Sequence, residues 1–122
     1  MNTIELLGEE ETFRNIVERK ITEFEDNKID VIGDYAFYKC NTLTNVSFPK
    51  ATSIGSQAFD SCSVLTTLYI GTELNTVCTL SNINAFKDCT NLTNIYVPES
   101  LVDDYKSATN WSSYASKIKE TP

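Results

Sequence analysis

A pattern of apolar and polar residues recurs three times along the chain. Each copy begins with Ala-Phe-x-x-Cys and continues into a run of the type Leu-x-x-Val-x-Phe, whose last part alternates between apolar and polar positions. The alternation predicts a half-buried β-strand. The phenylalanine and cysteine are three positions apart and therefore predict a short turn or single helical turn with both side chains on one face. The Ala-Phe pairs begin at residues 36, 58 and 85.

Repeats of this length and composition are typical of a solenoid. One unit cannot bury its apolar side alone, so we expect neighbouring units to stack and their strands to form a parallel sheet. The second spacing is longer than the first because of an insertion within residues 72–84, whose path the pattern leaves open. A degenerate unit lies upstream, where residues 21–24 align with residues 43–46.

The repeats resemble the BspA-type (Treponema-pallidum-type) leucine-rich repeat, which is widespread in bacterial proteins. The shared pattern Ile-Gly-x-x-Ala-Phe-x-x-Cys-x-x-Leu-Thr-x-Val-x-Phe-Pro covers residues 32–49 and 54–71 closely, and residues 85–98 after a divergent start. There Asn82 replaces the glycine, and Val77 or Leu80 must supply the missing isoleucine. The resemblance implies an α/β solenoid, a short right-handed leucine-rich-repeat stack with a parallel sheet. It also implies recognition of a protein or cell-surface ligand in a bacterial or prophage setting.

The flanking segments predict helical caps at both ends of a single domain spanning residues 1–122. In the first cap, residues 1–20, apolar residues recur at helical spacing between Glu9 and Lys20. The repeats occupy residues 21–98. The second cap, residues 99–122, follows Pro98, which suits the first turn of a helix. Asn110 is a candidate N-cap of a second short helix, whose shared face we expect to hold Trp111, Tyr114, Ala115 and Ile118.

Two columns of repeated side chains are expected in the core. The cysteine column is predicted to hold reduced, packed thiols, because side chains in a column point the same way; its members are Cys40, Cys62 and Cys89. The other column is Phe37, Phe59 and Phe86. Cys78 follows no repeat and is the most reactive candidate. Gly33 and Gly55 are interpreted as positions that need a positive φ.

Composition narrows the possible functions. The formal net charge is −7 and the chain has no histidine, the commonest general base and transition-metal ligand. We therefore expect no catalytic residues, no metal site and no cofactor. An acidic chain without a basic patch disfavours nucleic acid as a partner, and the short apolar runs disfavour membrane insertion. No signal peptide is visible, so the cytoplasm is the default location; the alternatives are a virion-associated or surface location reached by another route.

Outward-facing positions of the predicted strands are the candidate binding site. If the leucine, valine and phenylalanine of each run point inward, the alternate residues line the concave face of the sheet. The predicted ligand-binding residues are Asn45, Ser47, Thr67, Tyr69, Asn94 and Tyr96. Glu23 and Glu25 continue the same two columns upstream. Rigid aromatic rings beside adaptable polar groups are favoured in recognition. Alternatively, Tyr69 and Tyr96 only stabilise neighbouring strands as a lateral pair.

These observations favour a non-enzymatic leucine-rich-repeat binding module. The alternative is a structural or capping component of a bacterial or phage assembly without a ligand of its own. A thiol-dependent enzyme or redox protein is a third class, which the lack of a nucleophile beside a base disfavours. The ligand and the oligomeric state stay open.

Overall fold

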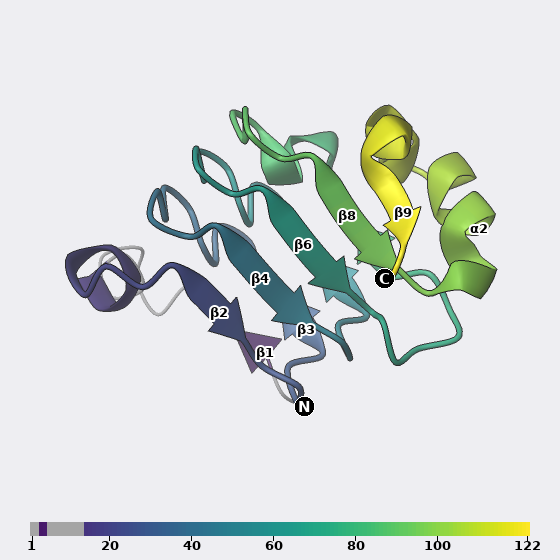
Figure 1. The fold of residues 1–122 in the computed structure, drawn as a ribbon, viewed down its shortest axis with the longest axis horizontal. Coiled ribbons are helices and arrows are strands. Elements are labelled where there is room, and N and C mark those ends of the chain that lie inside the picture. The colour runs from purple at the N-terminus through teal and green to yellow at the C-terminus, as the bar shows by residue number, and fades with distance from the viewer. Residues whose placement is uncertain (1–2, 5–13) are drawn as a thin grey trace.

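The fold is two parallel sheets joined by tight turns, as described by a computed structural model for residues 3–4 and 14–122. The larger sheet has the strand order β2 (Glu23–Glu25), β4 (Asn45–Phe48), β6 (Thr67–Ile70), β8 (Asn94–Val97) and β9 (Ile118–Glu120). The smaller sheet has the order β1 (Thr3–Ile4), β3 (Val31–Ile32), β5 (Ser53–Ile54) and β7 (Thr79–Leu80). Figure 1 shows the five longer strands side by side, with the shorter ones behind them.

The register of the larger sheet follows the sequence repeat. Residue pairs 22 positions apart lie side by side, for example Asn45 and Thr67 on β4 and β6. The degenerate upstream unit is confirmed as a strand, because Glu23 pairs with Asn45 and Phe24 with Val46. Each unit thus adds one strand to the larger sheet, and residues at the same repeat position form columns across that sheet.

The core lies between the two sheets and is built from the repeated apolar positions. Within β4, β6 and β8, buried residues alternate with half-buried ones. The ring of Phe59 is stacked between those of Phe37 and Phe86, with centroid separations of 5.3 and 5.6 Å. This stack lies along the solenoid axis, because each phenylalanine occupies the same place in its own unit.

The predicted cysteine column lies in this core as free, buried thiols. The Cys62 thiol donates a hydrogen bond to the carbonyl oxygen of Phe37 (3.1 Å), and the Cys89 thiol donates one to that of Phe59 (2.9 Å). These two thiols therefore bond to the backbone of the preceding unit. The column cysteines act as small packing groups whose thiol is a weak donor.

The interpretation of Gly33 and Gly55 was wrong, because neither residue has a positive φ. A Cβ atom built at Gly55 would lie 2.5 Å from the backbone nitrogen of Asp34 and 2.6 Å from the carbonyl carbon of Gly33. The repeat needs glycine at Gly55 because the backbones of adjacent units approach closely there. Left-handed conformations occur instead at non-glycine turn residues, including Tyr35, Gln57, Lys39, Ser61 and Asp88.

The insertion within residues 72–84 widens one turn without breaking the stack. The turn begins at Gly71, whose φ is +56°. The chain then rejoins the smaller sheet as β7, where Leu80 pairs with Ile54. Leu80 is therefore the residue that replaces the missing isoleucine. Asn82 starts the 3-10 helix η2 (Ile83–Phe86), and its side-chain oxygen accepts a hydrogen bond from the backbone nitrogen of Asn84.

The segments outside the repeats differ in part from the expected helical caps. At the first end, Arg14–Glu18 forms a π-helical turn, η1, in which Ile16 is buried. The remainder of the predicted first helix, residues 9–13, lies outside the described residues. After Pro98 the chain forms three short helices, η3 (Glu99–Leu101), α2 (Val102–Ser107) and η4 (Trp111–Lys117).

The tail is not helical throughout, because residues 118–120 form β9. Ile118 was expected on a helical face, but it is the first residue of this strand and pairs with Ile95 of β8. Asn110 was expected to cap a helix, and this too was wrong. Its side chain makes no capping hydrogen bond, and its φ of 68° is left-handed. The Asn110 amide instead donates to the carbonyl oxygen of Leu80, at 2.7 Å.

Side chains of the tail bind backbone groups of the last repeat. The hydroxyl of Tyr105 accepts a hydrogen bond from the backbone nitrogen of Cys78 (2.8 Å), and Trp111 Nε1 donates to the carbonyl oxygen of Cys78 (2.6 Å). Tyr114 and Lys117 bond the carbonyl oxygens of Ile83 and Leu92. In the stack, such groups pair with the backbone of the next unit. The tail therefore satisfies polar groups that the end of the stack would otherwise leave unpaired.

Candidate binding surface

The structure brings the six predicted site residues together on the outer face of the five-stranded sheet. Asn45 and Ser47 lie on β4, and Thr67 and Tyr69 on β6. The third pair on β8 is Asn94 and Tyr96. The register aligns them as two columns, because Asn45, Thr67 and Asn94 are paired in sequence across the sheet, and so are Ser47, Tyr69 and Tyr96. All six are half-buried.

A ladder of threonine hydroxyls lies next to these columns, at the start of each strand. The hydroxyl of Thr44 donates to the carbonyl oxygen of Thr22, and that of Thr66 donates to the carbonyl oxygen of Thr44, both at 3.1 Å. Thr93 bonds to Thr66 in the same way, at 3.4 Å. These hydroxyls hold adjacent units together, which fixes the positions of the neighbouring site residues.

Tyr69 and Tyr96 form a contacting pair on this face. Their ring centroids are 4.9 Å apart and their planes are inclined by 36°. This contact is the lateral pair that the sequence left as an alternative, and it stabilises the two strands. Each ring is also only half-buried, so the pair presents aromatic surface at the centre of the sheet. The two interpretations of the tyrosines are therefore compatible.

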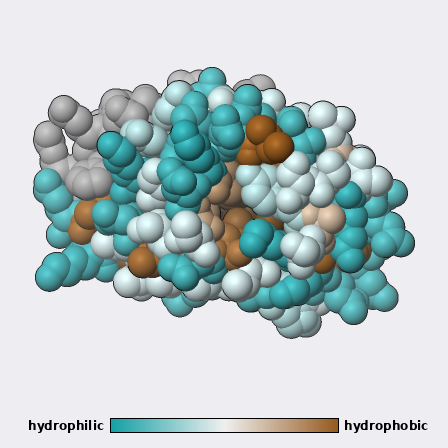
Figure 2. All heavy atoms as spheres, turned by 90° about the horizontal axis from the view of Figure 1, so that it is seen from above, coloured by the Kyte–Doolittle hydropathy of each residue, from teal (hydrophilic) through white to brown (hydrophobic). Residues whose placement is uncertain are grey.

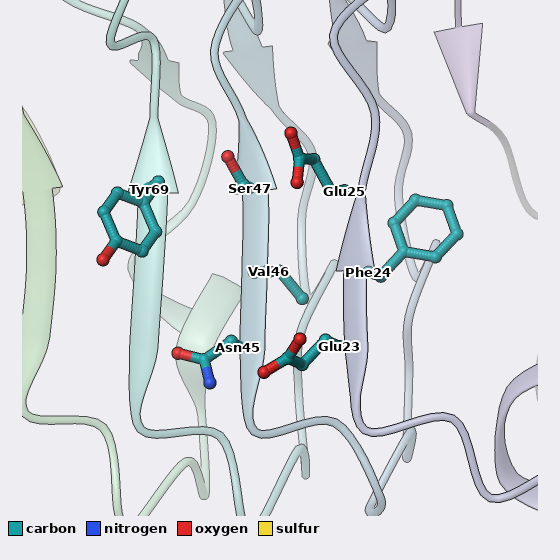
Figure 3. Close-up of a pocket in the computed structure, with 7 residues that line it drawn as sticks. All are labelled: Glu23, Phe24, Glu25, Asn45, Val46, Ser47 and Tyr69. Atoms are coloured by element: carbon teal, nitrogen blue, oxygen red, sulfur yellow. The ribbon is translucent and has the colours of Figure 1, made fainter.

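An open hollow adjoins Tyr69 on the side of β2. Its volume is about 480 Å³, and it is lined by Glu23, Phe24, Glu25, Asn45, Val46, Ser47 and Tyr69. Figure 3 shows the carboxylate of Glu23 directed toward Asn45, and Glu25 beside Ser47, with the Tyr69 ring on the other side of β4. Glu23 and Glu25 are exposed. The hollow therefore has carboxylates on one side and an aromatic ring on the other.

The opposite end of the face carries a positive charge that sequence reasoning missed. Lys119 lies on β9 next to Tyr96. Its ammonium group donates hydrogen bonds to the carbonyl oxygen of Thr93 and the side-chain oxygen of Asn94. The Ala-Phe-x-x-Cys pattern does not precede β9, and the pairing of Ile118 with Ile95 places Lys119 on this face. Across the sheet, the face thus runs from carboxylates through polar and aromatic groups to an ammonium group.

The part of the surface formed by the described residues contains few exposed large apolar side chains. Among the described residues, the large hydrophobic side chains that count as exposed are Val64 (37%) and Ile83 (47%). Figure 2 shows hydrophobic residues on one side of the molecule as small separate patches among hydrophilic ones. The outer face of the five-stranded sheet presents the polar and aromatic side chains of β4, β6 and β8 described above.

The thiols of the four cysteines are all buried. Cys78 was the most reactive candidate by sequence, but it is as inaccessible as Cys40 and Cys62. Burial raises the pKa of both Cys40 and Cys78 to about 12. The pKa of Cys62 is also raised, first by its hydrogen bond with Cys89 and then by burial. A thiol with a raised pKa is a poor nucleophile at neutral pH, because the thiolate is the reactive form.

Within residues 3–4 and 14–122, no group of three or more aspartate, glutamate, cysteine or histidine residues is placed to hold a metal ion. In the same residues, no helix has the length and apolar character needed to cross a membrane.

Comparison with protein families agrees with the repeat and the fold. The chain matches the family described as BspA type leucine rich repeat region in six copies, over residues 9–119. The chain belongs to this family. The match extends beyond the units recognised in residues 21–98, into both flanking segments. No curated protein and no solved structure matches the chain significantly. Membership of a leucine-rich-repeat family suggests a protein-interaction module.

Proposed function

We propose that this protein is a non-enzymatic binding module that recognises a protein or cell-surface ligand through the outer face of its five-stranded sheet. The observation that carries the proposal is the Tyr69–Tyr96 pair, which presents two contacting aromatic rings among half-buried polar side chains. Tyrosine supplies a large contact area at a small cost in conformational entropy, and asparagine, serine and threonine supply adaptable hydrogen bonds. The family to which the chain belongs supports the same function.

The size of the face indicates what kind of epitope it can bind. Five strands about 4.8 Å apart, each up to four residues long at about 3.3 Å per residue, give a face of roughly 19 by 13 Å. That is roughly 250 Å², compared with about 800 Å² per partner in a standard protein interface. The outer face alone therefore suits a short segment of a partner, bound with modest affinity.

Affinity capture with tyrosine variants tests the proposal. The wild-type chain and a Tyr69→Ala/Tyr96→Ala variant are immobilised and exposed to lysates of bacterial and animal cells, and the retained proteins are quantified by mass spectrometry. Central tyrosines of an interface contribute about 2 kcal/mol or more, so a true ligand should bind the variant more than about tenfold less tightly.

A second tyrosine pair in the chain provides the matched control. Tyr35 and Tyr38 also contact each other, with centroids 5.5 Å apart, but they lie in a turn and not on the sheet face. A Tyr35→Ala/Tyr38→Ala variant should retain the ligand. Both variants should fold, because loss of an aromatic pair costs only about 0.5–1.5 kcal/mol beyond the buried area. Far-UV circular dichroism verifies this. Equal capture by Tyr69→Ala/Tyr96→Ala and wild type would refute the proposed surface.

A further inference from the structure

The hollow beside Tyr69 has the chemistry of a site for an organic cation. Glu23 and Glu25 place two carboxylates on its β2 side, and the ring of Tyr69 lies on the other side of β4 with one face turned away from the sheet. A guanidinium or ammonium group is attracted both by carboxylates and by the negative face of an aromatic ring. The same chain already shows such a contact, because the ammonium group of Lys39 lies 5.1 Å from the ring centroid of Tyr38.

We propose that the hollow receives an arginine or lysine side chain from an extended basic segment of the partner protein. This inference rests on the proposed function and names the partner's chemistry. The carboxylates are exposed, and Asn45 and Ser47 between them and Tyr69 add hydrogen-bonding groups on the floor of the hollow. The formal net charge of −7 also steers basic segments toward the protein.

The charges across the face also orient the segment. Glu23 and Glu25 lie on β2 and Lys119 lies on β9, at opposite edges of the sheet. The two edges are roughly 19 Å apart at the usual strand spacing, which an extended peptide spans with about six residues. The best segment would therefore place its basic residue over β2 and a neutral or acidic residue about six positions away, over β9.

The test uses two small probes that differ in charge but hardly in shape. N-acetyl-arginine N-methylamide carries the guanidinium group, and N-acetyl-citrulline N-methylamide replaces it with an uncharged urea group. Each is titrated into the full ¹⁵N-labelled chain, and binding is followed by the amide resonances of residues 23–25, 45–47 and 69. We expect the arginine probe to shift these resonances saturably and the citrulline probe to bind at least about threefold more weakly.

Charge variants locate the site. A Glu23→Gln/Glu25→Gln variant should bind the arginine probe roughly three- to tenfold more weakly, because two exposed ion pairs are lost. The matched control is Glu99→Gln/Glu120→Gln, which changes the net charge equally at exposed positions outside the hollow. It should leave probe binding unchanged. Tyr69→Phe should retain binding because the ring is kept, whereas Tyr69→Leu should weaken it.

The outcomes separate this inference from the proposed function. The inference is overturned if the two probes bind equally, if Glu23→Gln/Glu25→Gln binds as the wild type does, or if the shifted resonances lie elsewhere. If the tyrosine variants lose a captured partner while Glu23→Gln/Glu25→Gln keeps it, the binding surface stands and the cation site is wrong. If the probe binds as expected but the tyrosine variants keep every captured protein, the surface proposal is what fails.

Discussion

Replacing Tyr105 by phenylalanine measures how much the tail contributes by satisfying the backbone of the last repeat. Tyr105 is fully buried, and its hydroxyl accepts the hydrogen bond of the equally buried backbone N–H of Cys78. Tyr105→Phe keeps the ring, which contacts Trp111 edge-on at 5.2 Å. It leaves the N–H group without that acceptor.

The expected loss follows from the burial of that N–H group. A buried donor left unsatisfied costs about 1–3 kcal/mol. Total stabilities of about 5–15 kcal/mol are usual for a domain, so the loss is a substantial part. With a urea dependence of about 1.5 kcal/mol per molar, a loss of about 2 kcal/mol lowers the unfolding midpoint by roughly 1.3 M urea.

Tyr114→Phe is the matched control. Tyr114 donates to the carbonyl oxygen of Ile83, and both residues are partly accessible to solvent. Water can replace the missing hydroxyl there, so the expected loss is at most about 1 kcal/mol. Unfolding is followed by the fluorescence of Trp111, the only tryptophan in the sequence, and in parallel by far-UV circular dichroism. If Tyr105→Phe destabilises the protein no more than Tyr114→Phe, the tail does not stabilise the stack by satisfying the backbone N–H of Cys78.

Two further predictions concern close packing and buried thiols. Gly55→Ala should lower the free energy of unfolding by about 1–3 kcal/mol in urea titrations, because the new Cβ meets the backbone of Asp34 and Gly33; an unchanged midpoint would contradict this. The stability that the buried thiols of Cys40 and Cys78 contribute should be fully present below pH 9.0, the ordinary pKa of a thiol. It should fall as the pH rises toward 12, the raised pKa of these two thiols in the folded protein. The reason is that the thiols of Cys40 and Cys78 ionise first in the unfolded chain. A Cys40→Ala/Cys78→Ala variant should lose less stability between pH 8 and 10.5 than the wild type, and an equal loss would show that other groups cause it.

The repeat spacing predicts part of the candidate site. Glu23 and Tyr69 are far apart in the sequence, yet they meet at one hollow because each unit advances the chain by one strand. The six site residues and the two upstream glutamates follow from that spacing alone. The hollow itself does not, because its shape depends on the direction of each side chain. Lys119 was not predicted either, since the Ala-Phe-x-x-Cys pattern does not precede its strand.

The features that recur in every unit could be predicted from the amino-acid pattern: the parallel register, the phenylalanine and cysteine columns, and the outward positions of β4, β6 and β8. Repetition makes these features robust, because the same apolar pattern must be buried in the same way each time. Features that occur once in the chain depend on long-range contacts and became visible only in the folded protein. Ile118 extends the sheet because β8 offers an unpaired edge, Asn110 bonds Leu80 because the tail lies against the last repeat, and Gly55 is needed because adjacent backbones nearly touch. These are long-range contacts of single residues, which no local pattern encodes.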